Sequence, residues 1–391
     1  MESPTPMPQP QRPETARRTV TIGVPAEDSP AERRFPLTPE CAAMLVDRGY
    51  AVKIESGAAA SINYTDMQYS SAGADIVSRD ETLRCDIVLH LAPLSASDAR
   101  KLRRGALLLG MLHAEAQDSA ALAVILERGV VGVALDLVGD GRGNLPFADI
   151  LAEIDGRASI AIASSLLADP AMGKGILIGG VAGIVPCEVT IIGSGIAAIA
   201  AARSALGLGA MVRMFDNDVY SLRAALRELG PGVVGSAIHP HVLTGALRSA
   251  DIVVATAVNP PGKIDAEDVS AMKKGVLTFD LTHGECTAFP SMPTVDLASA
   301  SPRDNDMVGR RRVCYVNAGN AVPRTAAMAI SNTFMTLVTD IFACDGITNA
   351  LKILPGLRQA VYAYLGRPVN RRIAQAMGLR HVDINLFLQF S

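Results

Sequence analysis

The feature that most constrains this chain is a glycine-rich turn between a strand pattern and a helix pattern, in VTIIGSGIAAIAAA (189–202). The turn has the form G-x-G-x-x-A and consists of Gly193, Ser194, Gly195, Ile196, Ala197 and Ala198. Gly193 permits the tight turn, and Gly195 lets the backbone approach a pyrophosphate at the helix N-terminus. The small Ala198 keeps the helix close to the sheet. This segment therefore predicts a dinucleotide-binding unit.

The next strand pattern, MVRMF (211–215), ends at Asp216, about 20 residues beyond the glycines. An acid at this place hydrogen-bonds a ribose 2′-hydroxyl and repels a 2′-phosphate, so the sequence favours NAD over NADP. Two alternatives stay open. Asp216 could be a solvated turn acid beside Asn217 and Asp218, and the whole turn could be a vestigial site.

Two series of strand patterns alternate with helical stretches along the chain. The first series is TVTIGV (19–24), AVKIES (51–56), DIVLHL (86–91), ALLLGML (106–112) and VVGVAL (130–135). The second series is EVTIIG (188–193), MVRMFD (211–216), DIVVAT (251–256) and GVLTFD (275–280). The fold class predicted is α/β, with two Rossmann-like, doubly wound domains.

Long helical patterns flank the second series, over 151–170 and about 326–343. Because the chain passes through one long helix before this unit and through another after it, we expect the second unit to be inserted into the first. The 391 residues are enough for two domains with separate cores.

Composition excludes several classes of protein. The formal net charge is only −3, which argues against nucleic-acid or membrane partners attracted by bulk charge. The most apolar stretch, 175–193, is broken by Pro186 and Glu188, so no spanning helix is expected. Six cysteines without a C-x-x-C pair favour reduced thiols and a cytoplasmic protein. Residues 1–18 are rich in proline and polar residues, and we expect a disordered tail.

Three stretches together resemble the alanine dehydrogenase and transhydrogenase domain I family: GVPAEDSPAERRFPLTPECAAMLVDRGYAVKIESGAA (23–59), GILIGGVAGIVPCEVTIIGSG (175–195) and VNAGNAVPRTAAMAISN (316–332). The resemblance implies a substrate domain over 19–150 plus 325–391 and an NAD-binding domain over 151–324. It also implies an NAD(H)-dependent interconversion of an amino acid and a 2-oxo acid in the interdomain cleft, by a dimeric or hexameric homo-oligomer.

Two residues match positions that carry the family's chemistry. Arg34, in ERRFPLTPE, occupies the family's arginine position, and a planar guanidinium suits bidentate carboxylate binding. Its neighbour Arg33 is the rival for this role. His113, in LLLGMLHAEA, matches the family's catalytic histidine and could shuttle a proton.

Other positions depart from the family. Where it has a K-V-K-E-P-like segment, this chain has LHLAPLSAS, which places His90 and Ala92 at the two basic positions. An ungapped comparison assigns the functional lysine to Ala92, so a substrate-binding cation is expected to be missing. His90 is a weaker replacement.

A second departure lies in FDLTHGEC (279–286), where the family has D-I-A-I-D-Q-G-G. Asp280 matches the first aspartate and belongs to the scaffold, whereas Gly284 is the ungapped counterpart of the second. A small gap would bring His283 or Glu285 to that place as an acid–base group. The alternative is a solvated loop.

The remaining polar candidates are weaker. Asn317 and Asn320 fall in the segment that passes close to nicotinamide in the family, so both are expected near cofactor or substrate. AEIDGR (152–157) resembles the family's S-E-V-A-G-R helix, with a structural Glu153–Arg157 pair. His239 and His241 lack a third ligand, and no metal site is expected.

The leading hypothesis is an NAD-dependent oxidoreductase of the alanine dehydrogenase type that acts on an amino, imino or oxo acid other than simply alanine. One alternative is a lyase or cyclodeaminase with tightly bound NAD. Another is a catalytically silent NAD-binding regulatory protein. The transhydrogenase branch is less favoured because the NADP domain and membrane segments are absent from this chain, although they could be on separate polypeptides.

Overall fold

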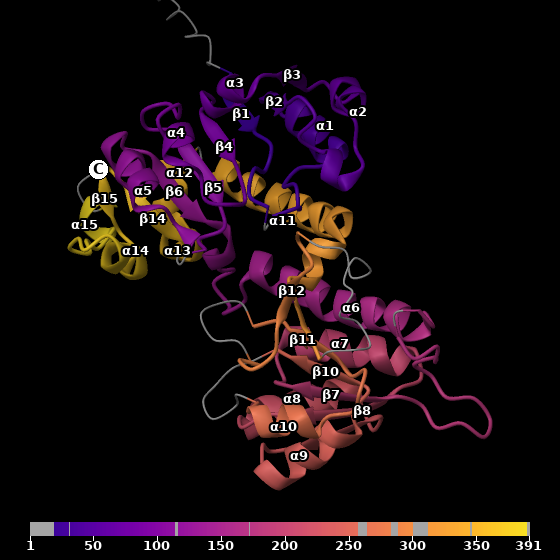
Figure 1. The fold of residues 1–391 in the computed structure, drawn as a ribbon. Helices are drawn as coiled ribbons and strands as arrows, with labels where there is room; N and C mark the ends of the chain where they lie inside the picture. The colour runs from indigo at the N-terminus through magenta and orange to yellow at the C-terminus, as the bar shows by residue number, and fades with distance from the viewer. Residues whose placement is uncertain are drawn as a thin grey trace, which may run out of the picture.

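The protein is described by a computed structural model that covers residues 19–30, 32–113, 116–171, 173–256, 264–282, 288–299, 312–344 and 346–388. Within these residues two sheets lie in separate parts of the molecule, one above the other in Figure 1. The expected tail, residues 1–18, lies outside the described residues. The arrangement confirms the predicted fold class.

The first sheet has the described strand order β15-β14-β6-β5-β4-β1-β2-β3. Its members are β1 (Thr21–Val24), β2 (Ala51–Glu55), β3 (Asp75–Val77), β4 (Ile87–Leu89), β5 (Leu107–Gly110), β6 (Val131–Ala134), β14 (Val361–Tyr364) and β15 (Arg367–Pro368). Strands β1 to β6 are parallel, and β14 and β15 add an antiparallel edge from the C-terminal part of the chain.

The second sheet has the described order β12-β13-β11-β10-β7-β8-β9, and its strand pairs are parallel. Its members are β7 (Glu188–Ile192), β8 (Met211–Phe215), β9 (Val233–Ser236), β10 (Ile252–Ala255), β11 (Leu277–Asp280), β12 (Thr294–Asp296) and β13 (Cys314–Val316). Because all its strands lie between those of the first sheet in sequence, the second unit is an insertion.

Helices cover both sheets. Those around the first sheet are α1 (Pro39–Asp47), η1 (Ala60–Ile62), α2 (Asp66–Ser71), α3 (Arg79–Leu83), α4 (Ala96–Ala99), α5 (Ser119–Glu127), η3 (Leu135–Leu137), α12 (Ile347–Ile353), α13 (Pro355–Gln359), α14 (Arg371–Ala376) and α15 (Asn385–Leu388). Those of the second unit are α7 (Ile196–Gly207), α8 (Val219–Leu229), α9 (Pro240–Ser249), α10 (Ala266–Ala271) and η4 (Ala318–Ala321).

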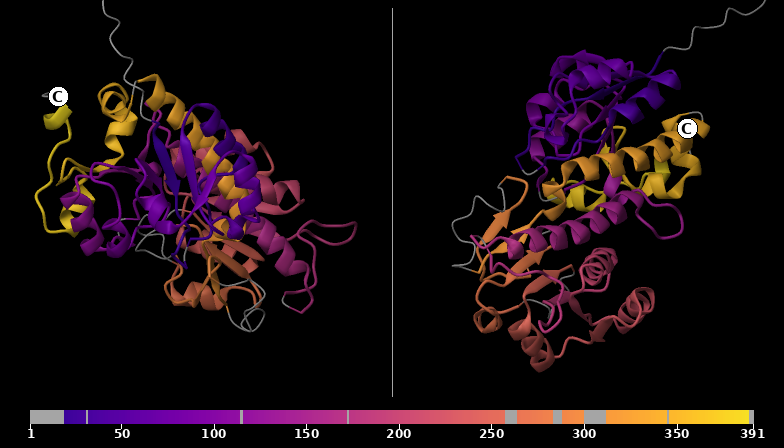
Figure 2. Two further views of the ribbon diagram at one scale, coloured as in Figure 1. Left: turned by 90° about the horizontal axis from the view of Figure 1, so that it is seen from above. Right: turned by 90° about the vertical axis from the view of Figure 1, so that its right-hand side faces the viewer.

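Two long helices, α6 (Pro146–Ala168) and α11 (Pro323–Ala343), join the two units. They confirm the helices expected over 151–170 and 326–343. They lie side by side between the two sheets (Figure 2). Helix α6 also packs on α7, and α11 packs on α1. The junction between the units is therefore a pair of helices rather than a single loop.

Strand register brings the carboxyl ends of the second sheet to one edge. Ile192 pairs with Phe215 and with Ala255, and Asp280 pairs with Ala255 and with Val316. The residues that follow these strands therefore meet at the same edge, where open α/β sheets bind their ligands.

The long helices carry no membrane signature. Among the described residues, none of the helices combines the length and the apolar character needed to cross a bilayer.

Candidate active site

The glycine turn after β7 has the geometry that a dinucleotide requires. Gly193 has a φ of 109°, and its N–H donates to the carbonyl of Phe215 at 2.7 Å. Gly195 precedes α7 in an extended conformation. A Cβ built on Gly195 would meet none of the described atoms within 4 Å. Open space therefore lies before the helix N-terminus, whose N–H groups and dipole favour an anion, and the turn fits a pyrophosphate.

Small residues bring α6 and α7 together beside this turn. A Cβ on Gly156 would lie 2.2 Å from the carbonyl oxygen of Ala197. Ala198 is fully buried, as expected for the third small residue of the motif. Ile196, the first residue of α7, has 42% of its surface exposed, and its contact with a cofactor stays a prediction.

Asp216 lies directly after β8 and is partly buried. Its Oδ2 accepts a hydrogen bond from the hydroxyl of Ser194 at 2.6 Å, and its Oδ1 accepts from the backbone N–H of Asp218 at 2.8 Å. These bonds fix the carboxylate beside the glycine turn. Each oxygen keeps a further acceptor site with which it could accept from a ribose hydroxyl, and this contact stays a prediction.

The side chain of Arg34 is buried in the loop after β1 and pairs with Glu32. Nε donates to Oε1 at 2.7 Å and Nη2 donates to Oε2 at 2.5 Å. Nη1 and the second hydrogen of Nη2 lie outside this pair and form the other bidentate edge of the guanidinium. The rival residue, Arg33, has an exposed side chain.

Several carboxylates surround Arg34. Burial acts to lower the pKa of Arg34, but the charge of Glu32 and its hydrogen bond raise it above the ordinary value. Asp155 and Glu27 add further negative charge in the same direction. The guanidinium is therefore charged at any working pH, inside an acidic environment.

The segment after β13 is tied to both units of the fold. Asn320 is buried, and its Oδ1 accepts from the backbone N–H of Arg33 at 2.9 Å. Asn317 has a φ of 57°, and its Nδ2 donates to Asp296 at 2.8 Å. The N–H of Gly319 donates to Asp155 of α6 at 2.6 Å. The structure thus brings Asn320 to the loop that carries Arg34.

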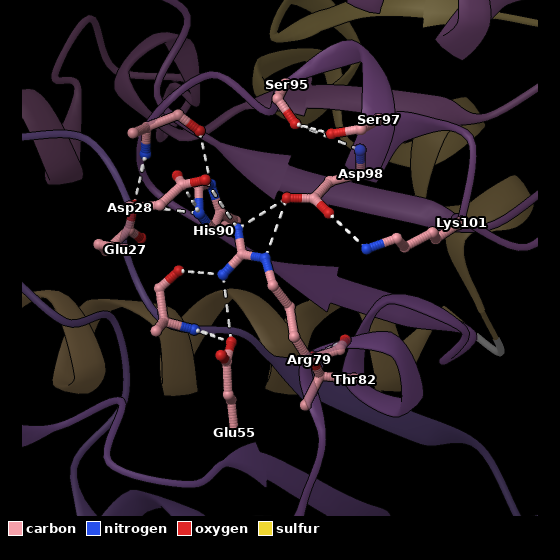
Figure 3. A network of polar contacts seen from close by, with 12 residues as sticks. Glu27, Asp28, Glu55, Arg79, Thr82, His90, Ser95, Ser97, Asp98 and Lys101 are labelled. Carbon is pink, nitrogen blue, oxygen red and sulfur yellow. Dashed lines mark hydrogen bonds and ion pairs between the residues drawn. The ribbon is translucent and has the colours of Figure 1, made fainter.

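His90 lies just after β4 and is 1% exposed. Its Nδ1 is 2.7 Å from the carbonyl oxygen of Ala92, so this nitrogen carries a proton. Its Nε2 makes no hydrogen bond with the described residues and lies 3.4 Å from Glu27 and 3.7 Å from Asp28 (Figure 3). The imidazole therefore faces two carboxylates and could serve as their cation when doubly protonated.

Glu27 links this histidine to the strand end. Its carboxylate accepts backbone hydrogen bonds from Leu91 at 2.5 Å and from Ala92 at 3.0 Å. Burial raises the pKa of Glu27, against the lowering effects of His90 and of these N–H groups. Ala92, which the ungapped comparison places at the family's lysine, is buried, and its N–H and carbonyl are both used in hydrogen bonds.

Arg79 fixes the loop that carries Glu27 and Asp28. Its Nη1 donates to the carbonyl of Ala26 at 2.8 Å and to Glu55 at 3.1 Å. Its Nε donates to Asp98 at 2.9 Å, as Figure 3 shows. This network holds the acidic loop in one place at the carboxyl ends of β1, β2 and β4.

His113 follows β5 and has an exposed side chain. Its φ of 38° is rare for a residue other than glycine. Such backbone strain costs roughly 1–3 kcal/mol and concentrates at functional positions. Its carbonyl accepts from the N–H of Ala116 at 2.8 Å. The catalytic role of His113 stays a prediction.

The acid loop after β11 is only partly described. Asp280 is buried and accepts from both the N–H and the hydroxyl of Thr282, and from the N–H of Ala288 at 2.7 Å. These bonds agree with the scaffold role predicted for it. His283 and Glu285 lie outside the described residues.

The histidines of the 239–241 segment stand at the start of α9 with exposed side chains. Among the described residues, no group of three or more His, Cys, Asp or Glu side chains is suited to a metal ion. On α6, Arg157 is exposed and Glu153 is partly buried, and the guanidinium lies 2.6 Å from the carboxylate.

Sequence reasoning missed Glu27 and Asp155 as members of the site. The available signal for Glu27 was an acid pair directly after a strand. For Asp155 it was a single acid beside apolar and small residues in the predicted long helix over 151–170. Neither residue belongs to a motif, and their partners are distant in the chain.

Comparisons with known proteins agree with this architecture. Models of the N-terminal and C-terminal domains of the alanine dehydrogenase/PNT family match residues 23–154 and 159–371. The chain is 28% identical over 366 residues to alanine dehydrogenase of Mycobacterium tuberculosis, covering 92% of this chain and 97% of the relative. It is 29% identical over 377 residues to alanine dehydrogenase of Geobacillus stearothermophilus, covering 94% and 99%.

Solved structures give the same result. An L-alanine dehydrogenase structure matches with a TM-score of 0.80 and 25% identity, over 92% of this chain and 99% of that one. A transhydrogenase of Sinorhizobium meliloti shares the fold, with a TM-score of 0.73, 19% identity and coverage of 89% and 100%. The family uses NAD(H), which confirms the predicted cofactor and makes the chain an NAD-dependent oxidoreductase. This chain belongs to the alanine dehydrogenase/PNT family.

Proposed function

We propose that this chain interconverts an amino or imino acid and the matching 2-oxo acid by hydride transfer, and that its substrate is not simply alanine. The observation that carries the proposal is Arg34, a buried and charged guanidinium with one bidentate edge outside its pair with Glu32. A carboxylate is the group that such an edge binds best. The relatives named alanine dehydrogenase support this reaction class.

The cofactor is held by the G-x-G-x-x-A turn, with Asp216 at the adenosine ribose and Asn317 on the nicotinamide side. Bound NAD(H) supplies or accepts the hydride. The open space at Gly195 and the fixed carboxylate of Asp216 support these assignments. The negative charge of Asp216 disfavours a 2′-phosphate.

His113 is the proposed proton donor and acceptor for the substrate. Its exposed side chain and strained backbone support a role beyond packing, and an imidazole can both donate and accept a proton. His283 and Glu285 are further candidates for acid–base work or substrate contact. Asn320 and His90 are proposed to line the substrate side.

Ala92 is the reason to expect a substrate other than alanine. The family lysine would add a second cation for the substrate carboxylate, and here the position is a methyl group with 6% exposure. Losing that cation weakens the hold on the carboxylate. A larger amino, imino or oxo acid could recover binding free energy through its side chain.

The proposal is tested by an NADH-oxidation screen with pyruvate, 2-oxobutyrate, 2-oxoisovalerate, phenylpyruvate and 2-oxoglutarate. Each acid is assayed without amine, with ammonium chloride and with methylamine. We expect an ammonia-dependent rate with at least one acid, and a rate with pyruvate below that of an ordinary alanine dehydrogenase. NAD that co-purifies through gel filtration without net turnover would instead indicate the lyase or cyclodeaminase alternative.

A matched pair of variants tests the carboxylate anchor. Arg34→Lys keeps a charge but loses the bidentate edge, and we expect KM for the 2-oxo acid to rise roughly tenfold or more. Arg33→Lys, at the exposed neighbouring position, is the control and should leave KM unchanged. Equal effects of the two substitutions would contradict the role of Arg34.

Assembly is also a proposal. We expect a homo-oligomer, dimeric or hexameric, and sedimentation equilibrium of the purified chain distinguishes these from a monomer.

A further inference from the structure

We propose that His90 carries a proton on Nε2 and is thereby a buried cation that holds the loop after β1, including Arg34, in place. His90 is a positioning residue in this role, because its side chain is fully buried and acts through Glu27 and Asp28. The link to Arg34 rests on the proposed function, whereas the assignment of the proton does not.

The first step concerns the protons of the ring. Nδ1 of His90 lies 2.7 Å from the carbonyl oxygen of Ala92, which can only accept, so Nδ1 carries a proton whatever the charge of the ring. A neutral imidazole has one N–H, so a neutral His90 would have a lone pair at Nε2. The charge of His90 is therefore decided at Nε2 alone.

The second step concerns the groups that Nε2 faces. It lies 3.4 Å from Oε2 of Glu27 and 3.7 Å from Oδ1 of Asp28, and both acids belong to the loop after β1 (Figure 3). An unprotonated Nε2 would place three acceptor atoms together without a donor among them. The side chains of His90 and Glu27 are 0% and 5% exposed, and such an arrangement is unfavourable in a buried place. A proton on Nε2 turns the same contacts into ion pairs.

The third step concerns the atom that holds the proton. Both oxygens of Glu27 already accept backbone N–H groups, from Leu91 at 2.5 Å and from Ala92 at 3.0 Å. Such bonds favour a charged carboxylate. Burial raises the pKa of Glu27, and the charge of His90 acts against burial. Glu27 therefore keeps its charge best when the proton is on Nε2 of His90.

The fourth step concerns the other cation at this loop. The guanidinium of Arg79 is shared among three carboxylates, those of Asp28 and Glu55 at 3.1 Å and that of Asp98 at 2.9 Å. Among the described residues, the ion-pair partner of Glu27 is His90. A neutral His90 would leave Glu27 buried without a cation, which is costly.

The fifth step connects this pair to the anchor. The N–H of Glu32 donates to the carbonyl of Ser29 at 3.0 Å, so a tight turn follows Asp28. Glu32 then pairs with Arg34 at 2.7 Å and 2.5 Å. A displacement of Glu27 and Asp28 is therefore transmitted through one turn to the guanidinium.

The sequence is consistent with a cation at this place. His90 stands at one of the two basic positions of the K-V-K-E-P-like segment, and Ala92 stands at the other. A protonated His90 retains one of the two charges.

The proton is tested by solid-state NMR of the purified full chain with nitrogen-15 in its histidines. The signal of His90 is the one that is absent from the spectrum of His90→Gln. We expect both ring nitrogens of His90 to carry protons at pH 7. An unprotonated Nε2 in this spectrum would overturn the proposal.

Two substitutions test the link to Arg34. His90→Asn retains an amide near the position of Nδ1 and loses the group at Nε2, whereas His90→Gln places its amide near Nε2. With whichever of the five screened 2-oxo acids reacts fastest, we expect His90→Asn to raise KM roughly tenfold, the usual effect of losing a bond to a charged group. Its kcat should stay within about threefold, because a weakened anchor affects the bound substrate and the transition state alike.

His90→Gln should keep KM within about threefold of the wild type, because an amide N–H can still face the two carboxylates. His241→Asn, at an exposed histidine of α9, is the control and should leave KM unchanged. Thermal unfolding verifies that each variant is folded.

Equal rises in KM for His90→Asn and His90→Gln, or an unchanged KM in a folded His90→Asn, would overturn the link between His90 and Arg34. A wild-type chain with a protonated Nε2 but without ammonia-dependent NADH oxidation would overturn the proposed function and support the buried cation.

Discussion

Replacing Gly156 by alanine tests the close crossing of α6 and α7, which positions the cofactor turn. The new Cβ would lie 2.2 Å from the carbonyl oxygen of Ala197 and 3.0 Å from the Cβ of Ala200. Carbon and oxygen normally approach to about 3.3 Å, so the two helices must separate by roughly 1 Å. Overpacking of this kind costs ~1–3 kcal/mol, and alanine returns up to ~1 kcal/mol of helix propensity. We expect a net destabilisation of ~1–2 kcal/mol.

Urea denaturation followed by circular dichroism measures this change in the free energy of unfolding. The matched control is Gly245→Ala, an exposed helical position in α9 where a Cβ would meet none of the described atoms within 4 Å. That substitution should stabilise the protein by ~0.5–1 kcal/mol. The affinity for NADH should weaken in Gly156→Ala and not in the control. Equal stabilisation by both substitutions would refute the close crossing.

Three further predictions concern the site and its supports. Asp216→Asn should reduce the preference for NADH over NADPH at least tenfold in kcat/KM, because the repulsion of a 2′-phosphate is lost; an unchanged ratio would contradict its role. His113→Asn, which tolerates a positive φ, should lower kcat roughly 10²- to 10⁴-fold with unchanged Kd for NADH, whereas full activity would exclude proton transfer by this residue. Burial acts to raise the pKa of Asp98, but hydrogen bonds from Arg79 and Lys101 outweigh burial and lower this pKa below its ordinary value. The stabilising effect of the ionised carboxylate is therefore present at neutral pH and is lost as pH falls below about 4. Asp98→Asn should therefore lower the Tm at pH 7, and the Tm of the variant should fall less than that of the wild type as the pH is lowered. Curves of Tm against pH that run parallel for the two proteins would contradict this.

The parts of the fold that were predictable have local patterns. Strands β1, β2, β4 to β8, β10 and β11 are apolar runs bounded by turns, and the two long helices have helical periodicity over many residues. Strands β3, β9, β12 and β13 were missed because each has only three or four residues, whereas the equally short β4 lies inside the longer apolar run 86–91. Strand β14 was missed because its antiparallel partner, β6, lies more than two hundred residues earlier. Such pairings depend on tertiary structure rather than local preference.

The site divides in the same way. The turn from Gly193 to Ala198 was predictable because its small residues are needed locally, for the tight turn, for the open approach to the backbone and for the close packing of the helix on the sheet. Glu27 and Asp155 were not, because their hydrogen-bond partners are 64 and 164 residues away along the chain. Arg34 was predicted as a carboxylate anchor. Its pair with Glu32 was not predicted, because it depends on the conformation of the loop, which no sequence pattern indicates.

The central claim is that hydride passes between the cofactor and the carbon that bears the substrate nitrogen. It is tested most directly by incubating the wild-type chain with NADH that carries deuterium at both C4 positions, ammonium chloride and the 2-oxo acid preferred in the screen. Mass spectrometry of the product measures the transferred label. We predict an amino acid one mass unit heavier, with deuterium at Cα, formed in equal amount to the NAD⁺ released. An unlabelled product, or turnover without net oxidation of NADH, would contradict the proposed reaction.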